Sequence, residues 1–302
     1  MAPSGRELPR FDPTTPNEAR IHDYLMGGKD NFAADREAAA KVLQLVPDFP
    51  MLIGESRRFL DRVVRFLAEA GIRQFIDIGC GLPTRGNVHE IAQSAAPDAR
   101  VVYVDKDPVV VAHVHALLAN SPQTTVIQAD ARDVEKILAD PALTAMVDLD
   151  QPVAILLISL LPSITEDDVA AEVVERLREL IPPGSYLVIS HGISDVFPEV
   201  TAELAAFVQD QRIVTGVRRC NLRARADIEP YFGGLEVVEP GVVHLPEWRP
   251  DRTETVVDPQ SVWVIGGVGQ KTAACGSAGT PVTAVAHTGH VGTGGSPTSP
   301  GP

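Results

Sequence analysis

The sequence predicts a doubly wound α/β fold, in which a mostly parallel sheet of seven strands is covered by helices on both faces. Short, almost continuously apolar runs alternate with helical patterns between residues 73 and 190, which is the arrangement of βαβ units. Continuous apolar runs are typical of strands that are buried on both faces. Glycines follow the first run and an acidic residue ends the second, so the carboxyl edge of the sheet is the expected functional edge.

The parallel core is preceded by a helix that we expect over residues 55–70. Large apolar residues from Phe59 to Leu67 recur at helical spacing, and Gly71 can end the helix. Five strands follow, with their cores at 73–79, 100–105, 124–130, 153–159 and 185–190. The helices between these strands are expected near 86–95, 107–119, 133–139 and 166–181.

Beyond the parallel core, a helix is expected at 197–211 and a short one ending at Gly233. Two strand-like segments, 235–245 and 261–267, are expected to pair as an antiparallel hairpin at the edge of the sheet.

Residues 272–302 consist mainly of Gly, Ser, Thr and Pro, a composition that cannot offset the entropy of ordering and predicts a disordered tail. The predicted organisation is therefore an N-terminal helical extension or lid over 1–54, one domain over 55–271, and this tail.

Composition limits the classes of partner. The 302 residues are 44% apolar and 22% charged, which is enough for a substantial core. A formal net charge of −14 opposes contacts with phosphates, so no nucleic-acid partner is expected. Residues 1–20 contain no apolar signal region, and Val153 to Leu161 is about half the length that spans a bilayer. We therefore expect no membrane association and a cytoplasmic location.

Three cysteines, Cys80, Cys220 and Cys275, are odd in number and far apart, so neither a disulfide framework nor a metal site is expected. Cys80 has no neighbouring base and is expected to pack rather than react. The histidines of the tail, His287 and His290, are too few to form a metal site on a flexible segment.

The turn after the first strand is the most informative local feature. Gly79 and Gly81 let the backbone pass close to a ligand at the carboxyl end of the strand. The second strand ends at Asp105, where an acidic side chain can accept hydrogen bonds from both hydroxyls of an adenosine ribose. Asp107 is the better N-cap for the helix that begins at Pro108, which leaves Asp105 for the ribose.

Two nucleotide classes fit this pattern. Dinucleotide sites require a third glycine to bring a helix N-terminus to the pyrophosphate, and this chain has Thr84 there. S-adenosylmethionine has no phosphate and requires only the glycine turn, the ribose acid and an adenine pocket. The third strand ends in Asp130, which can accept from the adenine amino group. The sequence therefore favours S-adenosylmethionine, with an NAD-dependent oxidoreductase as the alternative.

At these residues the chain resembles the class I S-adenosylmethionine-dependent methyltransferases, and more narrowly a bacterial S-adenosyl methyltransferase family long described as a domain of unknown function. The narrower resemblance covers roughly residues 13–270 and is most specific at Tyr24-Leu25-Met26-Gly27-Gly28-Lys29-Asp30-Asn31. It implies a Rossmann-like fold and S-adenosylmethionine as the cofactor. It also implies cofactor contacts at Gly79, Gly81, Asp105 and Asp130. The full set of predicted cofactor-binding residues adds Asp77, Lys106, Ala131 and Ser159.

The residues that would bind the methyl acceptor are less clear from the sequence. His191 follows the fifth strand and is a candidate general base at the rim of the site. Tyr24, Lys29 and Asn31 flank consecutive glycines and are candidates for a lid over the ligand. Relatives in this class lead us to expect a histidine after the fourth strand, where this chain has Pro162.

The expected function is methyl transfer to an unidentified acceptor, with a small molecule preferred because of the acidic charge. A protein that binds the cofactor without catalysis, as a sensor or scaffold, is a further alternative.

Overall fold

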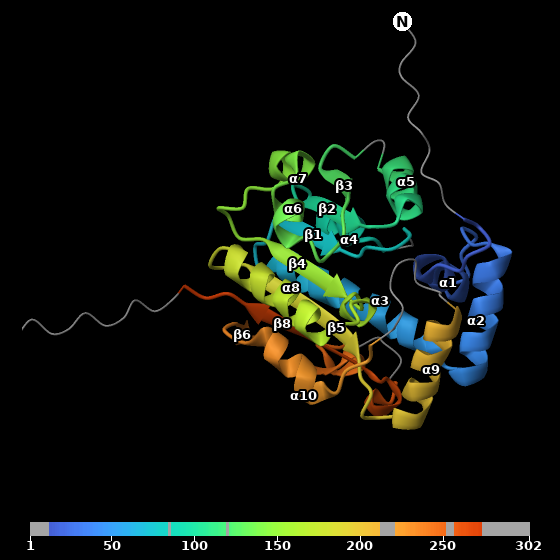
Figure 1. The fold of residues 1–302 in the computed structure, drawn as a ribbon. Coiled ribbons are helices and arrows are strands. Elements are labelled where there is room, and N and C mark those ends of the chain that lie inside the picture. Colours follow the sequence, from blue (N-terminus) through green and yellow to red (C-terminus); the bar gives the residue numbers. More distant parts are fainter. Residues whose placement is uncertain (1–11, 84–85, 119–120, 212–220, 252–256, 274–302) are drawn as a thin grey trace, which may run out of the picture.

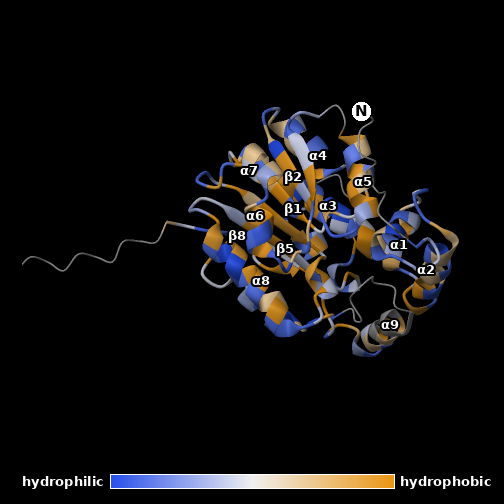
Figure 2. Ribbon diagram, turned by 45° about the horizontal axis from the view of Figure 1, so that its top comes forward, coloured by the Kyte–Doolittle hydropathy of each residue, from blue (hydrophilic) through white to orange (hydrophobic). Residues whose placement is uncertain are grey.

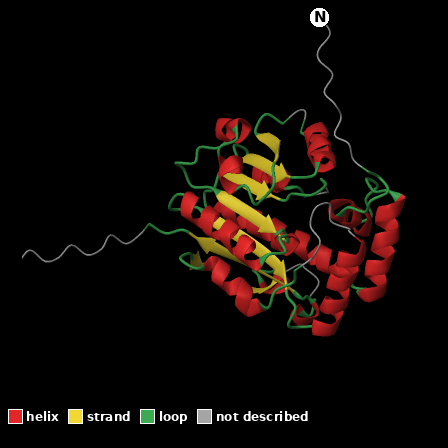
Figure 3. Ribbon diagram, in the orientation of Figure 1, coloured by secondary structure: helices red, strands yellow, loops and turns green. Residues whose placement is uncertain are grey.

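The structure is a computed structural model that describes residues 12–83, 86–118, 121–211, 221–251 and 257–273. At its centre is an eight-stranded sheet in the order β3-β2-β1-β4-β5-β8-β6, with β7 also paired to β8 (Figure 1, Figure 3). The strands are β1 (Gln74–Ile78), β2 (Arg100–Asp105), β3 (Thr124–Gln128), β4 (Ala154–Ile158), β5 (Tyr186–Gly192), β6 (Glu236–Val237), β7 (Val243–His244) and β8 (Val264–Gln270). The predicted fold class is confirmed.

Helices cover both faces of this sheet, α3 behind it and α8 in front (Figure 1). Phe59, Val63 and Leu67 of α3 are fully buried, as their helical spacing predicts. Figure 2 shows the apolar residues concentrated on the strands. The helices are α1 (Glu18–Leu25), α2 (Ala33–Leu45), α3 (Phe49–Glu69), α4 (Val88–Ala95), α5 (Pro108–Leu117), α6 (Val134–Leu138), α7 (Pro141–Met146), α8 (Asp167–Leu180), α9 (Pro198–Gln211) and α10 (Arg225–Ile228).

The antiparallel edge differs from the expected hairpin. The segment predicted as one strand over 235–245 forms two short strands, β6 and β7, which both pair antiparallel with β8. Pro240 and Gly241 separate them, and proline cannot donate a ladder hydrogen bond. β8 also pairs antiparallel with β5 along its whole length, so the sheet has eight strands rather than seven.

The parallel register brings distant residues to one edge. Ile78 is level with Val104 in β2, and Val104 is level with Ile127 in β3. The residue that follows β1, Gly79, therefore lies beside the end of β2 at Asp105. β4 ends next to β1 on the other side.

The N-terminal helices gather at this carboxyl edge, where α1 and α2 lie beside α9 (Figure 1). A buried ion pair joins α1 to α2, because Arg20 Nε donates to Asp35 Oδ2 over 2.9 Å. The backbone N–H of Asn17 also donates to Asp35 Oδ1. The domain boundary expected at residue 54 falls within α3, so one continuous helix connects the extension to the sheet. The predicted tail lies outside the described residues from residue 274 onward.

Candidate functional site

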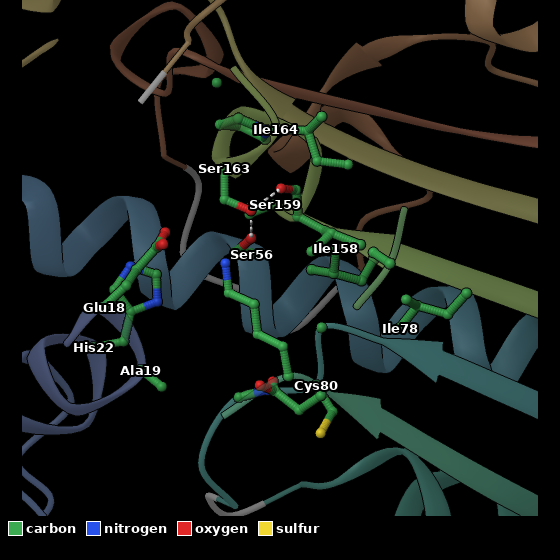
Figure 4. A pocket seen from close by; sticks show the side chains of 18 of the residues that line it. Glu18, Ala19, His22, Ser56, Ile78, Cys80, Ile158, Ser159, Ser163 and Ile164 are labelled. Atoms are coloured by element: carbon green, nitrogen blue, oxygen red, sulfur yellow. Dashed lines mark hydrogen bonds between the residues drawn. The ribbon is translucent and has the colours of Figure 1, made fainter. Parts of the chain in front are cut away.

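A cavity of about 980 Å³ opens at the carboxyl ends of β1, β2 and β4 and is bordered by α1 and α3. Figure 4 shows Glu18, Ala19 and His22 on one side of it and Ser56, Ser159 and Ser163 on another. This volume is at the upper end of the range for ligand pockets, ~300–1,000 Å³, which leaves room for two reactants. Every predicted cofactor residue lines it, namely Asp77, Gly79, Gly81, Asp105, Lys106, Asp130, Ala131 and Ser159.

The glycine turn requires its glycines for two different reasons. Gly79 has a φ of +75°, and a Cβ there would lie 2.5 Å from Cδ1 of Leu160. Gly81 has a φ of +66°, but a Cβ there would meet nothing within 4 Å. Backbone conformation is therefore the reason for Gly81, and the open space beside it is available to a ligand.

The carboxylate of Asp105 connects the turn to the end of β2. Its Oδ2 accepts from the N–H of Gly81 over 3.0 Å, and its Oδ1 accepts from the N–H of Asp107 over 2.9 Å. Burial raises the pKa of Asp105, and these two N–H groups lower it. Because an ionised carboxylate offers about four acceptor positions, each oxygen can still accept from a hydroxyl in the cavity.

Asp107 caps α5, as the sequence predicts. Its Oδ1 accepts from the N–H of Val109 over 2.8 Å, and Pro108 is the first residue of the helix. The carboxylate of Asp105 is therefore not required as the helix cap.

Asp77 lies in β1, two residues before Gly79, and is buried near Arg57 and Asp105. Burial raises its pKa to about 7, the guanidinium of Arg57 opposes that shift, and Asp105 adds to it. Arg57 also donates to the carbonyl of Gly86 over 2.6 Å. Arg57 could not be recognised from the sequence, because a charged residue on an amphipathic helix such as α3 is ordinarily solvated.

On the β3 side of the cavity, Asp130 is engaged by Arg132. Oδ1 of Asp130 accepts from the N–H and from Nε of Arg132, and Oδ2 accepts from Nη2 over 2.6 Å. These bonds lower the pKa of Asp130, so it is ionised at neutral pH. They also leave fewer free acceptor positions than Asp105 has.

Ser159 follows β4 with a φ of 53°, in the left-handed region that a non-glycine residue rarely adopts. Its N–H donates to the carbonyl of Ser190, and its hydroxyl lies 3.3 Å from the hydroxyl of Ser190 and 3.4 Å from that of Ser56. Figure 4 shows Ser56 and Ser159 facing each other at the cavity. Such a backbone conformation costs about 1–3 kcal/mol and is typical of functional sites.

His191 does not lie at the rim of the site, which is the position that the sequence predicts for it. Its side chain is fully buried in β5 and is not among the residues that line the cavity. Its Nδ1–H donates to the carbonyl of Gly192 over 2.7 Å, and its Nε2 accepts from Nη1 of Arg223 over 3.1 Å. Burial lowers its pKa to about 4. Both ring nitrogens are thus hydrogen-bonded inside the protein, which favours a structural role for His191 over the predicted role of general base.

Replacing His191 therefore tests a structural role. His191→Asn is expected to lower the free energy of unfolding by about 1–3 kcal/mol, because it leaves buried polar partners unsatisfied. The affinity for S-adenosylhomocysteine, measured by calorimetry on the folded variant, is expected to stay within about twofold. A loss of affinity with unchanged stability in a urea titration would show that the residue acts at the site instead.

The lid residues expected from the sequence do not reach the cavity. Tyr24 and Lys29 are exposed, and Nδ2 of Asn31 donates to Asp23 Oδ2 over 2.9 Å. Gly28 is required by the packing of this loop, because a Cβ there would lie 1.9 Å from Oδ1 of Asp23.

The residues of the predicted extension that do line the cavity come from α1 and from the start of α3, namely Asn17, Glu18, Ala19, His22, Phe49, Leu52 and Ile53. The extension therefore borders the cavity through α1 and the start of α3 and not through Tyr24, Lys29 or Asn31.

Within the described part of the chain, no group of three or more His, Cys, Asp or Glu side chains could hold a metal ion. None of the helices in that part combines the length and the apolar character needed to cross a membrane. Cys80 is described and has no disulfide partner there, whereas Cys220, Cys275, His287 and His290 lie outside the described residues.

A sheet of this order, with a glycine turn and an acidic residue at neighbouring strand ends, defines the Rossmann-like methyltransferase fold. The chain belongs to the S-adenosyl methyltransferase family, whose sequence model matches residues 4–272. This membership makes S-adenosylmethionine the cofactor and decides against the NAD-dependent alternative.

Two solved structures resemble the chain over most of its length. A candidate methyltransferase from Thermobifida fusca YX is 42% identical over 86% of this chain and 96% of its own, with a TM-score of 0.80. A DUF574 family protein from Streptomyces avermitilis MA-4680 is 40% identical over 87% of this chain and 100% of its own, with a TM-score of 0.81. No curated protein matches the chain.

The residues present fit the cofactor that the family implies. The open space at Gly81 allows close approach to the backbone, and the Asp105 carboxylate retains acceptor positions toward the cavity. Pro162, which stands where a histidine was expected, also lines the cavity and cannot take a proton. Any proton acceptor must therefore come from another element.

Proposed function

We propose that this chain binds S-adenosylmethionine between the Gly79–Gly81 turn and Asp105, and methylates a small molecule held in the rest of the same cavity. The observation that carries this proposal is the hydrogen bond between the N–H of Gly81 and Asp105 Oδ2, which fixes the turn and the ribose acid at one point of the cavity. Asp105 would accept from the ribose hydroxyls. Asp130 and Ala131 would border the adenine.

The cofactor supplies a methyl group that is already activated by a sulfonium, so the protein must chiefly position an acceptor and exclude water. Holding two reactants in a productive geometry can lower the barrier by ~7–11 kcal/mol. In this chain α1 and α3 border the cavity above the strand ends. The bound reactants would thus be shielded on the side that faces away from the sheet.

Charge supports a small acceptor over a nucleic acid. The residues that line the cavity include Glu18, Asp130, Glu166 and Asp168, and these carboxylates would repel a phosphate backbone. Among the described residues, the Lys and Arg side chains that line it are Arg57, Lys106 and Arg132, and Arg132 is paired with Asp130.

Isothermal titration calorimetry with S-adenosylhomocysteine and with NAD tests the cofactor site. The chain is expected to bind S-adenosylhomocysteine and to bind it more tightly than NAD, because the turn lacks the third glycine that a pyrophosphate site requires. Tighter binding of NAD, or no binding of S-adenosylhomocysteine, would refute the proposal.

A further inference from the structure

An aromatic wall stands opposite the cofactor residues and is formed by His22, Phe49 and Trp263, which all line the cavity. The ring centroids of His22 and Phe49 are 6.2 Å apart, and those of Phe49 and Trp263 are 6.4 Å apart. Trp263 precedes β8, which lies beyond β5 in the sheet. The wall thus reaches the side of the cavity farthest from Asp105, where the acceptor would bind.

Aliphatic side chains continue this apolar surface. Leu52 and Ile53 of α3 line the cavity next to Phe49. Leu204 of α9 and Leu222, which precedes Arg223, also line it. Flat apolar ligands bind between such side chains because aromatic groups pack edge-to-face or in offset stacks. The surface therefore favours a planar, largely apolar molecule.

α1 connects this wall to the cofactor side. Its N-cap, Asn17, donates from Nδ2 to Oδ2 of Asp107, two residues beyond the ribose acid. His22 lies five residues later, ~7.5 Å along the helix axis, and packs near Phe49. The hydrogen bond at Asn17 therefore fixes how far His22 stands from the cofactor residues.

His22 is the histidine that α1 presents to the cavity. No hydrogen bond or ion pair to its ring nitrogens is present among the described residues, and the same is true of the Glu18 carboxylate. The two residues are four apart and thus share one face of the helix, and Figure 4 shows them together at the cavity. Burial lowers the pKa of His22 while Glu18 opposes that shift, so the imidazole is neutral at pH 7 and can accept a proton.

We infer that the methyl acceptor is a planar apolar molecule with a hydroxyl group, and that His22 takes the proton of that hydroxyl. This inference rests on the proposed function and specifies its acceptor side. The acceptor oxygen forms a bond to the methyl carbon as the carbon–sulfur bond breaks and leaves its electron pair on sulfur. The O–H bond breaks in the same step, and its proton goes to the imidazole. The resulting imidazolium is stabilised by the Glu18 carboxylate.

A hydroxyl fits these groups better than an amine does. A neutral imidazole nitrogen accepts a hydrogen bond from a hydroxyl without any prior loss of charge. An alkylammonium would first have to lose a proton before its nitrogen could accept a methyl group, and a nearby carboxylate such as Glu18 would favour its charged, unreactive form.

Ligand-observed NMR titrations of the full chain saturated with S-adenosylhomocysteine test the inference. The probes are 2-naphthol, 2-methylnaphthalene, which has a methyl group in place of the hydroxyl, and 2-(aminomethyl)naphthalene, which is a cation at neutral pH. We expect 2-naphthol to bind roughly threefold to tenfold more tightly than 2-methylnaphthalene, as one net hydrogen bond predicts. We expect His22→Phe, which keeps a ring against Phe49, to abolish this difference.

A second readout uses the unmodified chain, in case His22→Phe fails to fold. The side-chain 15N resonances of His22 are expected to shift with 2-naphthol and not with 2-methylnaphthalene. The control is His115→Phe on the exposed face of α5, which should leave all affinities unchanged. Equal affinities for the two neutral probes, no nitrogen shift, or tightest binding of the amine would each overturn the inference. If S-adenosylhomocysteine itself fails to bind, the proposed function fails instead.

Discussion

Asp105→Ala is expected to weaken the binding of S-adenosylhomocysteine by roughly tenfold to a hundredfold. The substitution removes a charged acceptor from the ribose hydroxyls, which is worth ~1.5–3 kcal/mol. It also removes the hydrogen bond that the N–H of Gly81 donates to Asp105 Oδ2 over 3.0 Å. The glycine turn thereby loses its attachment to the end of β2. Isothermal titration calorimetry on the wild type and the variant measures the effect.

The control for this experiment is Asp98→Ala. Asp98 lies at the opposite end of β2, its side chain is 73% exposed, and it is paired only with the partly exposed Arg73 among the described residues. This variant should bind S-adenosylhomocysteine as the wild type does. Unchanged affinity in Asp105→Ala, with a melting temperature near that of the wild type, would remove Asp105 from the cofactor site.

Asp77→Asn is expected to increase the free energy of unfolding of the ligand-free protein at pH 8. In the folded chain burial raises the pKa of Asp77 from 3.8 to about 7. Between these values the folded state binds more protons than the unfolded state, so Asp77 makes the wild type less stable as the pH rises from about 4 to about 7. Three pKa units correspond to a cost on the order of 4 kcal/mol, which the uncharged amide avoids.

Urea unfolding of the wild type and Asp77→Asn at several pH values measures this difference. The gain in stability of Asp77→Asn over the wild type should be smallest near pH 4, should grow toward pH 7 and should then level off. His191 acts in the opposite direction, because its lowered pKa makes the fold more stable as the pH rises from about 4 to 6.5. Both proteins share that contribution, and it cancels in the comparison. A gain that is constant with pH, or that shrinks toward pH 7, would contradict the role assigned to the buried charge.

The parallel core, and the grouping of the predicted cofactor residues around one cavity, could be predicted because local patterns determine both. A buried strand followed by Gly79 and Gly81, and a strand that ends in Asp105, place these residues at one edge once the strands are parallel. The register of β1 and β2 then brings Gly81 and Asp105 within hydrogen-bond distance. Pairing between adjacent strands is the only long-range information that this step required.

The surface that we propose for the acceptor could not be predicted, because it depends on how separate elements pack. The consecutive glycines near Lys29 are typical of a mobile lid, but in the structure Gly28 is required because the side chain of Asp23 packs against it. His22 belongs to the same segment and gives no local signal, since only the placement of α1 over the sheet brings it to the cavity.

The sequence predicts the wrong environment for His191 for a related reason. The sequence pattern predicts that the fifth strand ends at residue 190. The next side chain, His191, would then be exposed at the rim of the site. In the structure β5 continues to Gly192 because β8 pairs with it there, and His191 is level with Ile265. Arg223 then covers the ring from a segment that lies far along the chain. A contact of this kind leaves no pattern near residue 191.

A crystal structure of the chain with S-adenosylhomocysteine is the most direct test of the cofactor site. We predict that both ribose hydroxyls lie within about 3.2 Å of the Asp105 carboxylate oxygens, with the sulfur directed toward the side of the cavity where His22 stands. A ribose bound away from Asp105, or a ligand that leaves the space beside Gly81 empty, would contradict the assignment of the methyl-donor site.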